Sequence, residues 1–466
     1  MKKFMGMICV WLLFSTAYAY EPGIYEKVNN SDDLTCKETI FLSGEPITLT
    51  GTLSISQSGK GKTAKESYEY QLSDENGNSV SRDLTFSISA NEKANKQVSK
   101  VWELTDFSES VVIGDKTYTL EKYDFSKTVL DDVKPVGRYF AGNINLSKQY
   151  SYDGGTVKVL GSGSIYGYDT AWSKNETVSM TYTLSNKPDT GYAWSGKYKT
   201  ITSQTDQKKV TYISNRPTEI SFDGGYMLSE SNLFTLRYSY EMPEVYNGKV
   251  LDYIVSDEGS YKFESFPVGT RLPNYLLKGI KGHWGEMALR QAYALEYMDE
   301  WDATDTPNTA VTRGEFAKIM ALALKLDLEK KAEGEAIVYK DVQETNPYYK
   351  YIMALTREGV VTGTGNSRFQ PNAVISRAEA ITMMINAIGF EDKAPEPLPL
   401  LQFNDAASIP KWAEKYVYMA NKIGLMQGDE YGNALATKQL TKAEIATMTN
   451  NMVRYLIEDL GEEYVL

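Results

Sequence analysis

The stretch Thr312-Arg313-Gly314-Glu315 recurs in this chain as Ser376-Arg377-Ala378-Glu379 and again as Thr441-Lys442-Ala443-Glu444. Each copy has a hydroxyl residue, a cation, a small residue and a glutamate, and the copies start 64 and 65 residues apart. Spacing this regular is typical of one structural unit repeated three times. We therefore expect three repeats between about residues 276 and 460.

Each copy of the motif predicts the start of a helix. In a capping box, the hydroxyl accepts a hydrogen bond from the amide three residues later, and the glutamate reaches back to the amide of the capping residue. Such a cap stabilises a helix by ~1 kcal/mol. The six capping residues are Thr312, Glu315, Ser376, Glu379, Thr441 and Glu444. The apolar pairs that flank the caps are Val311 with Phe316, Ile375 with Ala380, and Leu440 with Ile445.

The cation of each motif occupies the first helical position. Arg313, Arg377 and Lys442 therefore oppose the helix macrodipole, at a cost of ~0.3–1 kcal/mol when exposed. A helix start with free amide groups and a neighbouring cation is a binding site for an anion. Three such cations in register predict an anion site. The alternative is three solvated surface cations beside ordinary caps.

The hydrophobic pattern of the same region predicts helices. Apolar residues at three- and four-residue spacing indicate two helices in each unit. The expected ranges are 287–298 and 314–326, then 348–358 and 378–388, then 413–423 and 443–456. A proline-rich stretch at 394–400 separates the second unit from the third and should be extended.

Aromatic residues keep the register of the repeat. Trp284 and Trp412 lie 29 and 30 residues before the motif cation of their units. The middle unit has Pro347 at this position, so Tyr348 or Tyr349 would have to replace the tryptophan.

Glycine turns follow twelve residues after the aromatic position. Gly359 and Gly424 stand there in units two and three, and each is suited to a helix C-cap. Each opens a five-residue segment that ends on a second glycine, Gly363 or Gly428. The first unit has Glu296 at this place and no glycine turn.

These features together resemble the S-layer homology domain. The residues that carry the resemblance are Asp341 and Asp405, Trp412-Ala413, the glycine turns, Arg368-Phe369-Gln370-Pro371 and the capping motifs. It covers units at 276–335, 336–392 and 401–460, and three is the usual number in that family. The resemblance implies an all-α pseudo-trimer whose grooves bind secondary cell-wall polysaccharide non-covalently, often through a pyruvate ketal on an amino sugar.

The resemblance also implies which residues bind carbohydrate. They are Trp284, Arg313, Gly359, Gly363, Arg377, Trp412, Gly424, Gly428 and Lys442. The chemistry agrees, because a ketal carboxylate is an anion, an indole face suits the apolar side of a sugar, and a glycine turn lets backbone amides approach. Lys442 lacks the planar fork of arginine. Since unit one also lacks the glycine turn and unit two lacks the tryptophan, we expect one or two working grooves.

The N-terminal part of the chain has the sequence pattern of β-strands. Segments rich in Thr, Tyr, Val and Ile lie at 47–55, 68–72, 84–88, 156–160, 178–184, 210–213 and 234–240. Turn signals such as Asn76-Gly77 and Gly114-Asp115 separate them. The pattern predicts an all-β antiparallel region of two sandwich-like domains, 20–135 and 136–272, with a seam near Lys134-Pro135.

The first 19 residues predict an export signal. Lys2 and Lys3 precede a short apolar run, and Ala17-Tyr18-Ala19 is a cleavage site. The alternative is an uncleaved anchor. Cleavage would leave a mature chain of formal net charge −14, down from −12, which disfavours nucleic acid as a partner. We expect export from a bacterium and no membrane insertion, and Cys36 would have no partner in the mature chain.

Candidate catalytic and metal residues are scarce. His283 is the only histidine, which excludes a Ser-His-Asp triad and multi-histidine metal sites unless it supplies the sole imidazole. Asp74-Glu75-Asn76-Gly77-Asn78 resembles the start of a calcium loop, but the twelfth position is Thr85 and not glutamate. We expect no cofactor, metal or catalytic residue, a structural role for His283, and core positions for the strand aromatics, Tyr166, Tyr168, Trp172, Tyr182, Tyr192, Trp194 and Tyr198.

The sequence therefore favours a secreted protein of the bacterial cell wall or S-layer. It would be anchored by its repeats to secondary cell-wall polysaccharide and would display a structural or adhesive β region, with self-assembly or surface proteins as further partners. One alternative is a wall-tethered, glycan-active enzyme with a carboxylate pair in the β region. Another is a tether between an outer membrane and the wall, which would need regular ten-residue lipid-facing strands that the segments lack.

Overall fold

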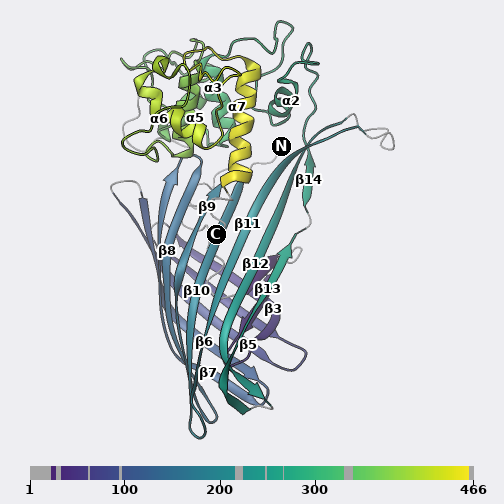
Figure 1. The fold of residues 1–466 in the computed structure, drawn as a ribbon, viewed down its shortest axis with the longest axis vertical. Helices are drawn as coiled ribbons and strands as arrows, with labels where there is room; N and C mark the ends of the chain where they lie inside the picture. The colour runs from purple at the N-terminus through teal and green to yellow at the C-terminus, as the bar shows by residue number, and fades with distance from the viewer. Residues whose placement is uncertain are drawn as a thin grey trace.

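The computed structural model describes residues 23–27, 33–60, 63–93, 97–215, 224–246, 249–265, 267–329 and 339–460. The predicted export signal at 1–19 lies outside these residues. Long strands form one part of the molecule, and a group of short helices covers one end of them (Figure 1).

The described strands form one antiparallel sheet in which each strand from β1 to β13 pairs with the next, while β14 pairs with β12. The strands are β1 (Gly23–Lys27), β2 (Asp33–Ile40), β3 (Ile47–Lys60), β4 (Thr63–Ser73), β5 (Ser79–Glu92), β6 (Gln97–Ile113), β7 (Lys116–Lys134), β8 (Gly137–Tyr152), β9 (Gly155–Thr170), β10 (Ser173–Pro188), β11 (Trp194–Ile213), β12 (Gly225–Tyr246), β13 (Lys249–Glu264) and β14 (Val268–Arg271).

The predicted division into two sandwich-like domains at residue 135 is not what the structure has. Lys134 pairs with Gly137, so Pro135 lies in the tight turn of a β7–β8 hairpin inside one sheet. The predicted strands were also too short. In β5, buried residues alternate from Val80 to Ala90 with outward Ser, Asp and Thr. Only every second residue of such a strand is apolar, so the apolar residues in the sequence do not show where the strand begins and ends.

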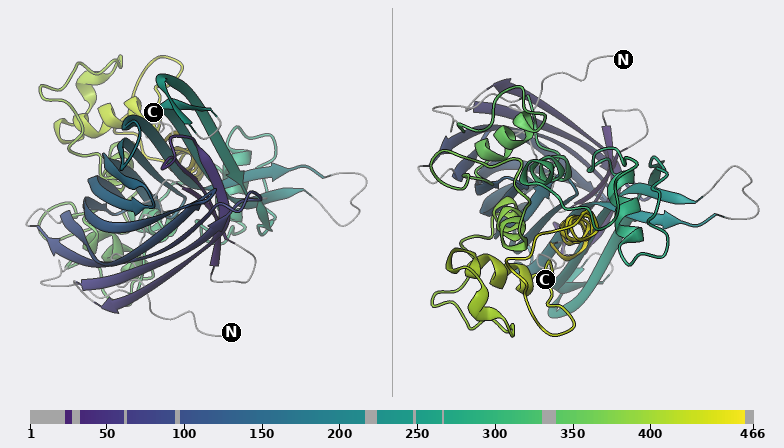
Figure 2. Two further views of the ribbon diagram at one scale, coloured as in Figure 1. Left: turned by 90° about the horizontal axis from the view of Figure 1, so that it is seen from below. Right: turned by 90° about the horizontal axis from the view of Figure 1, so that it is seen from above.

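The sheet curls back on itself and encloses one core. The early strands, drawn in purple, pass behind the later teal strands, and the view along the strands shows the sheet wrapping round (Figures 1 and 2). Phe41, just after β2, stacks on Tyr198 of β11 with ring centroids 4.2 Å apart. Thr48 Oγ1 lies 2.6 Å from the Tyr261 hydroxyl, which joins β3 to β13.

This core holds charge as well as apolar side chains. The buried cations are Arg82, Lys100, Lys127, Arg138 and Lys148, and the buried carboxylates of the sheet are Glu38, Glu66, Glu109, Asp131 and Glu176. Arg82 lies 2.9 Å from Glu38 and 2.8 Å from Glu109. The buried cations and the buried carboxylates are equal in number, and buried groups need such opposite charges nearby to stay ionised. The sequence analysis did not predict this network.

The helical part contains the six predicted helices. They are α2 (Glu286–Ala294), α3 (Arg313–Ala323), α4 (Tyr349–Arg357), α5 (Arg377–Ile388), α6 (Glu414–Lys422) and α7 (Lys442–Arg454). Two 3₁₀ turns, η1 (Ala406–Ser408) and η2 (Lys411–Ala413), precede α6, and a π-helical turn, η3 (Tyr455–Asp459), follows α7. No helix in the described residues is long and apolar enough to cross a membrane.

The second helix of each unit packs on the first helix of the next unit. The pairs are α3 with α4, α5 with α6, and α7 with α2, so the order closes into a ring. The first helix of each unit ends in the same turn, in which Tyr297, Val360 and Leu425 donate to carbonyls five residues earlier. Glu296 takes a φ of 59° at the place where Gly359 has 78°, so unit one makes the turn without glycine.

The helices are joined to the sheet through their carboxyl ends. Last-turn carbonyls have no partner within a helix, and here side chains from the sheet supply one. Trp172 Nε1 donates to the Ala323 carbonyl at 2.8 Å, and Gln207 Nε2 donates to that of Ile457 at 3.1 Å. Trp172 and Tyr168 lie in the same buried cluster as the helices. The two parts therefore share a core.

Candidate functional site

All three predicted capping boxes are present. Thr312, Ser376 and Thr441 each accept from the amide of the glutamate three residues on, and that glutamate accepts from the amide of the capping residue. The apolar residues that flank the caps are all buried. This part of the prediction is confirmed.

The amide groups at the helix starts are not free. The amide of Arg313 donates to Ala373 of unit two at 2.8 Å, and that of Arg377 donates to Lys438 of unit three at 2.9 Å. The amide of Lys442 donates at 2.9 Å to Thr309 of unit one. The prediction of open amide donors is therefore wrong. Each helix start binds the loop of the following unit, so the motif joins the units.

The motif cations also join one unit to the next. Arg313 Nη1 lies 2.7 Å from Glu379 Oε1, and the residue is only 6% exposed. Lys442 Nζ lies 2.6 Å from Asp305 Oδ1 and the residue is 8% exposed. Arg377 Nη2 lies 3.0 Å from Glu444 Oε1. Such pairs offset the unfavourable macrodipole term and leave Arg313 and Lys442 little access to solvent.

The described part of the chain has a cavity of about 470 Å³ where the three units meet, which we call the open groove. Unit one contributes Trp284, whose side chain lies just before α2, and unit two contributes Arg377. The remaining lining comes from unit three: Leu425, Met426, Gln427, Gly428, Asp429, Leu435, Lys438, Glu444, Thr447, Met448 and Asn451. The structure thus brings together Trp284, Arg377 and Gly428 from the predicted set.

Two cations and one carboxylate form the polar wall of the open groove. Glu444 Oε1 lies 3.0 Å from Arg377 and 2.8 Å from Lys438 Nζ. Burial alone would raise the pKa of Glu444, but the bonds from Lys438 and the Thr441 amide and the charge of Arg377 lower it. The side chain of Lys438 is 47% exposed and can turn toward a ligand.

The opposite wall of the open groove consists of an aromatic side chain and a glycine turn. Trp284 is 66% exposed, so its indole face is free to stack on a ring. A Cβ at Gly428 would lie 3.3 Å from the backbone of Gly432, so a side chain there would crowd the floor of the groove. An aromatic face, a small residue and cations in one groove suit a sugar that carries a carboxylate.

The other predicted site residues lie outside the lining of the open groove. Trp412 is 53% exposed in η2, and Arg313 and Lys442 lie in the ion pairs between units. Gly359 and Gly424 have φ values of 78° and 73° and end the first helices of their units, as predicted.

Gly363 has a structural reason to be glycine. Its φ is 84°, and a Cβ there would lie 2.5 Å from the Arg368 carbonyl. L residues with side chains rarely take this conformation.

The sequence analysis missed several residues of the open groove, above all Lys438 and Thr447. Lys438 stands three residues before its cap and could have been noticed as a second cation. No local signal shows that Trp284 of unit one faces the turn of unit three, because that contact depends on the ring closing.

The aspartates before the helices hold the loops of the same region. Asp341 accepts from the amides of Phe369 and Gln370 at 2.9 and 2.8 Å. Asp405 accepts in the same way from Ala434 and Leu435. Burial would raise the pKa of Asp341, but these amide donors lower it overall. The two aspartates thus hold the segments that lead into the helix caps at Ser376 and Thr441.

The weaker signals have structural explanations. Asp74 Oδ1 accepts from the amides of Asn76 and Asn78 at 2.9 Å, so this carboxylate shapes the β4–β5 turn. His283 Nδ1 accepts from the Gly285 amide at 3.1 Å. Of the strand aromatics, Tyr168, Trp172, Tyr182 and Tyr198 are buried as predicted, while Tyr192 is 89% exposed.

Comparison with known families identifies the helical region. Residues 338–381 and 402–446 match the S-layer homology domain. Two segments of the helical region are therefore similar to the S-layer homology domain. The match covers units two and three, and unit one shares their capping box, turn and packing.

Similar curated proteins agree with a surface location. The chain is 32% identical over 124 residues to the Surface-layer 125 kDa protein of Lysinibacillus sphaericus, covering 27% of this chain and 10% of that protein. It is 30% identical over 142 residues to S-layer protein sap of Bacillus anthracis, covering 30% and 16%. An endoglucanase of Bacillus sp. (strain KSM-635) is 27% identical over 175 residues, covering 37% and 18%. The chain thus spans less than a fifth of these relatives, and the family places it at the cell wall or S-layer.

Proposed function

We propose that this protein is held non-covalently on secondary cell-wall polysaccharide by the open groove of its three units and displays the curled sheet at the cell surface. The observation that carries the proposal is the convergence of Trp284, Arg377 and the 425–429 turn from three units on one cavity. The ring order of helices supports a pseudo-threefold spindle for the whole helical part.

The ligand best suited to the groove is a pyruvylated amino sugar. Trp284 would stack on the apolar face of the ring, since exposed indole favours such contact. Lys438 and Arg377 would attract the ketal carboxylate. Glu444 already holds both cations, so the ligand would share them, and we expect moderate affinity with a strong salt dependence.

Co-sedimentation with purified cell-wall sacculi tests this proposal. The mature chain should sediment with pyruvylated sacculi and should stay in solution when the ketal has been removed by mild acid. Lys438→Ala should weaken binding about tenfold, with Lys415→Ala, a lysine of α6 outside the groove lining, as the matched control. Equal sedimentation with and without the ketal would remove the carboxylate from the account.

The sheet region serves, in this proposal, as the displayed part. Its outer face is polar, and its interior is filled by apolar side chains and paired charges. Because the helices share a core with the sheet, the groove and the sheet keep a fixed relation. A layer component or a spacer needs such rigidity.

A wall-tethered glycan-active enzyme is the second candidate, because relatives are named endoglucanase and exoglucanase. The buried carboxylates Glu38, Glu109 and Asp131 all lie in ion pairs of 2.7–3.1 Å with buried cations, which suits a structural role. Reducing sugar released from cell-wall or plant polysaccharide by the mature chain would favour the enzyme.

A further inference from the structure

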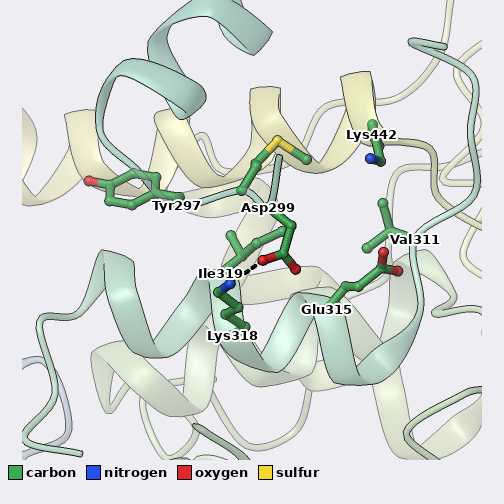
Figure 3. A pocket seen from close by; sticks show the side chains of 8 residues that line it. Tyr297, Asp299, Val311, Glu315, Lys318, Ile319 and Lys442 are labelled. Carbon is green, nitrogen blue, oxygen red and sulfur yellow. Dashed lines mark hydrogen bonds and ion pairs between the residues drawn. The ribbon is translucent and has the colours of Figure 1, made fainter. Parts of the chain in front are cut away.

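The open groove has a counterpart where the turn of unit one meets the motif cation of unit three. The turn after α2, 297–299, matches 425–427, and Lys442 matches Arg377 as the motif cation. This counterpart, which we call the closed groove, has a volume of only about 10 Å³, against about 470 Å³ in the open groove. Its lining residues are Tyr297, Met298, Asp299, Val311, Glu315, Lys318, Ile319 and Lys442 (Figure 3).

An ion pair crosses the closed groove. The carboxylate of Asp299 points to the amine of Lys318 and binds it, as the dashed line in Figure 3 marks. At the matching positions of the open groove stand Gln427 and Thr447, which carry no charge. Two charged side chains therefore fill the space that two neutral ones leave free.

A second carboxylate holds the motif cation of the closed groove. Lys442 Nζ lies 2.6 Å from Asp305, and both side chains are about nine-tenths buried or more. Alanine, Ala434, stands at the position of Asp305 in unit three. Arg377 of the open groove has no carboxylate at this position; its partner is Glu444, 3.0 Å away, which also binds Lys438.

The aromatic position of the repeat also differs in the closed groove. Pro347 stands at the tryptophan position of unit two, and its neighbour Tyr348 packs on the start of α3, since a Cβ on Gly314 would lie 2.5 Å from the Tyr348 Cδ2. The ring therefore rests on the cap of α3. Burial first, and then the carboxylates Glu315 and Asp299, raise the pKa of Tyr348 to about 12, which agrees with its place beside the groove.

We propose that the closed groove is a copy of the sugar site whose ligand carboxylate is replaced by the chain's own Asp299 and Asp305. These two side chains occupy Lys318 and Lys442 and exclude a pyruvylated sugar. The inference rests on the proposed function of the open groove. It means that the differences at residues 299, 305 and 318, together with the missing tryptophan of unit two, keep the closed groove from binding the wall.

Transferring the closing pair to the open groove is the safer test, because both positions line a cavity. Gln427→Asp with Thr447→Lys in the mature chain should weaken binding of a pyruvylated amino-sugar methyl glycoside by about tenfold or more in calorimetry. The control pair, Gln402→Asp with Ala407→Lys, places the same two charges at exposed positions of unit three outside the groove lining and should bind like the parent. Binding by the charged pair within about twofold of the parent would overturn the inference.

The reverse transfer tests whether the closed groove can be opened. In a Trp284→Ala chain, whose binding should be weakened by about tenfold or more, Asp299→Gln, Asp305→Ala and Lys318→Thr introduce the residues of unit three. A folded variant, checked by circular dichroism, should bind the same glycoside at least about threefold more tightly than the Trp284→Ala chain does. A folded variant that binds no more tightly than the Trp284→Ala chain would contradict the inference. A parent chain that binds no glycoside would instead contradict the proposed function itself.

Discussion

The helical units and the curled sheet both bury ion pairs, but they do so in different places. In the helices, the pairs lie at the seams between units and each joins one unit to the next, as Arg313 joins Glu379. In the sheet, the charges lie in the core, where Arg82 of β5 binds Glu38 of β2 and Glu109 of β6. An ion pair between two units fixes how the units align. In the core of the sheet, by contrast, each charged side chain needs an oppositely charged partner of its own. The sheet should therefore be the more fragile part.

The largest expected effect tests this difference in the sheet. Arg82→Ala leaves Glu38 and Glu109 buried with less compensation and should lower the free energy of unfolding by ~3–5 kcal/mol. Arg237→Ala, an exposed arginine of β12, should change it by less than ~0.5 kcal/mol. Urea unfolding followed by circular dichroism measures both. Similar small effects would show that the core charges contribute little.

Acid should act on the same network. Burial opposes ionisation of Glu109, but Arg82 and Lys148 lower its pKa from 4.5 to about 2. Its contribution is therefore complete above pH 4.5 and is lost as the pH falls toward 2, by on the order of 3 kcal/mol. Unfolding free energy measured across this range should fall, and Glu109→Gln should flatten the slope. An unchanged slope in that variant would contradict the assignment.

The joint between the two parts should give an intermediate effect. Trp172→Phe removes the donor to the Ala323 carbonyl and should cost ~1–3 kcal/mol, because the buried carbonyl loses its partner. Since the parts share a core, sheet and helices should unfold in one transition in the parent and separate in stronger joint variants. Calorimetry that shows two independent transitions in the parent would contradict the shared core.

A single helix cap should give the smallest effect. Ser376→Ala removes the side chain that accepts from the Glu379 amide and should cost ~1 kcal/mol. Ser376→Asn keeps an acceptor and should restore most of that stability. A loss well above this range would mean that the cap also controls the seam between units two and three.

The same contrast explains what could be predicted from sequence. Each helical unit carries its signals within a few residues, so Thr312-x-x-Glu315 gave the helix start without knowledge of the rest. Each strand of the sheet pairs with the next, but the curl of the sheet depends on contacts between distant strands such as that of Thr48 with Tyr261. Lys134-Pro135 marked a hairpin turn where a domain boundary was expected. Buried charges such as Arg82 look like surface residues in a sequence, because burial of a paired cation leaves no periodic trace.

The candidate site could be predicted from the sequence less well than the helix starts but better than the sheet. Arg377, Trp284 and Gly428 were predicted as carbohydrate-binding residues of three different units, and the structure brings them into one groove. Arg313 and Lys442 were predicted by the same motif, yet their carboxylate partners come from other units and could not be assigned from local sequence. Repeats predict the kinds of residue in a site, and ring closure decides which of them meet.

The most direct test of the account compares two tryptophans at matching positions. Trp284 lines the open groove and Trp412 does not, although both are exposed and stand at the same place in their units. We expect Trp284→Ala to weaken binding of the mature chain to pyruvylated wall polysaccharide by about tenfold or more, and Trp412→Ala to leave it within about twofold of the parent. Equal losses in the two variants, or a loss in Trp412→Ala alone, would contradict the assignment of the binding groove.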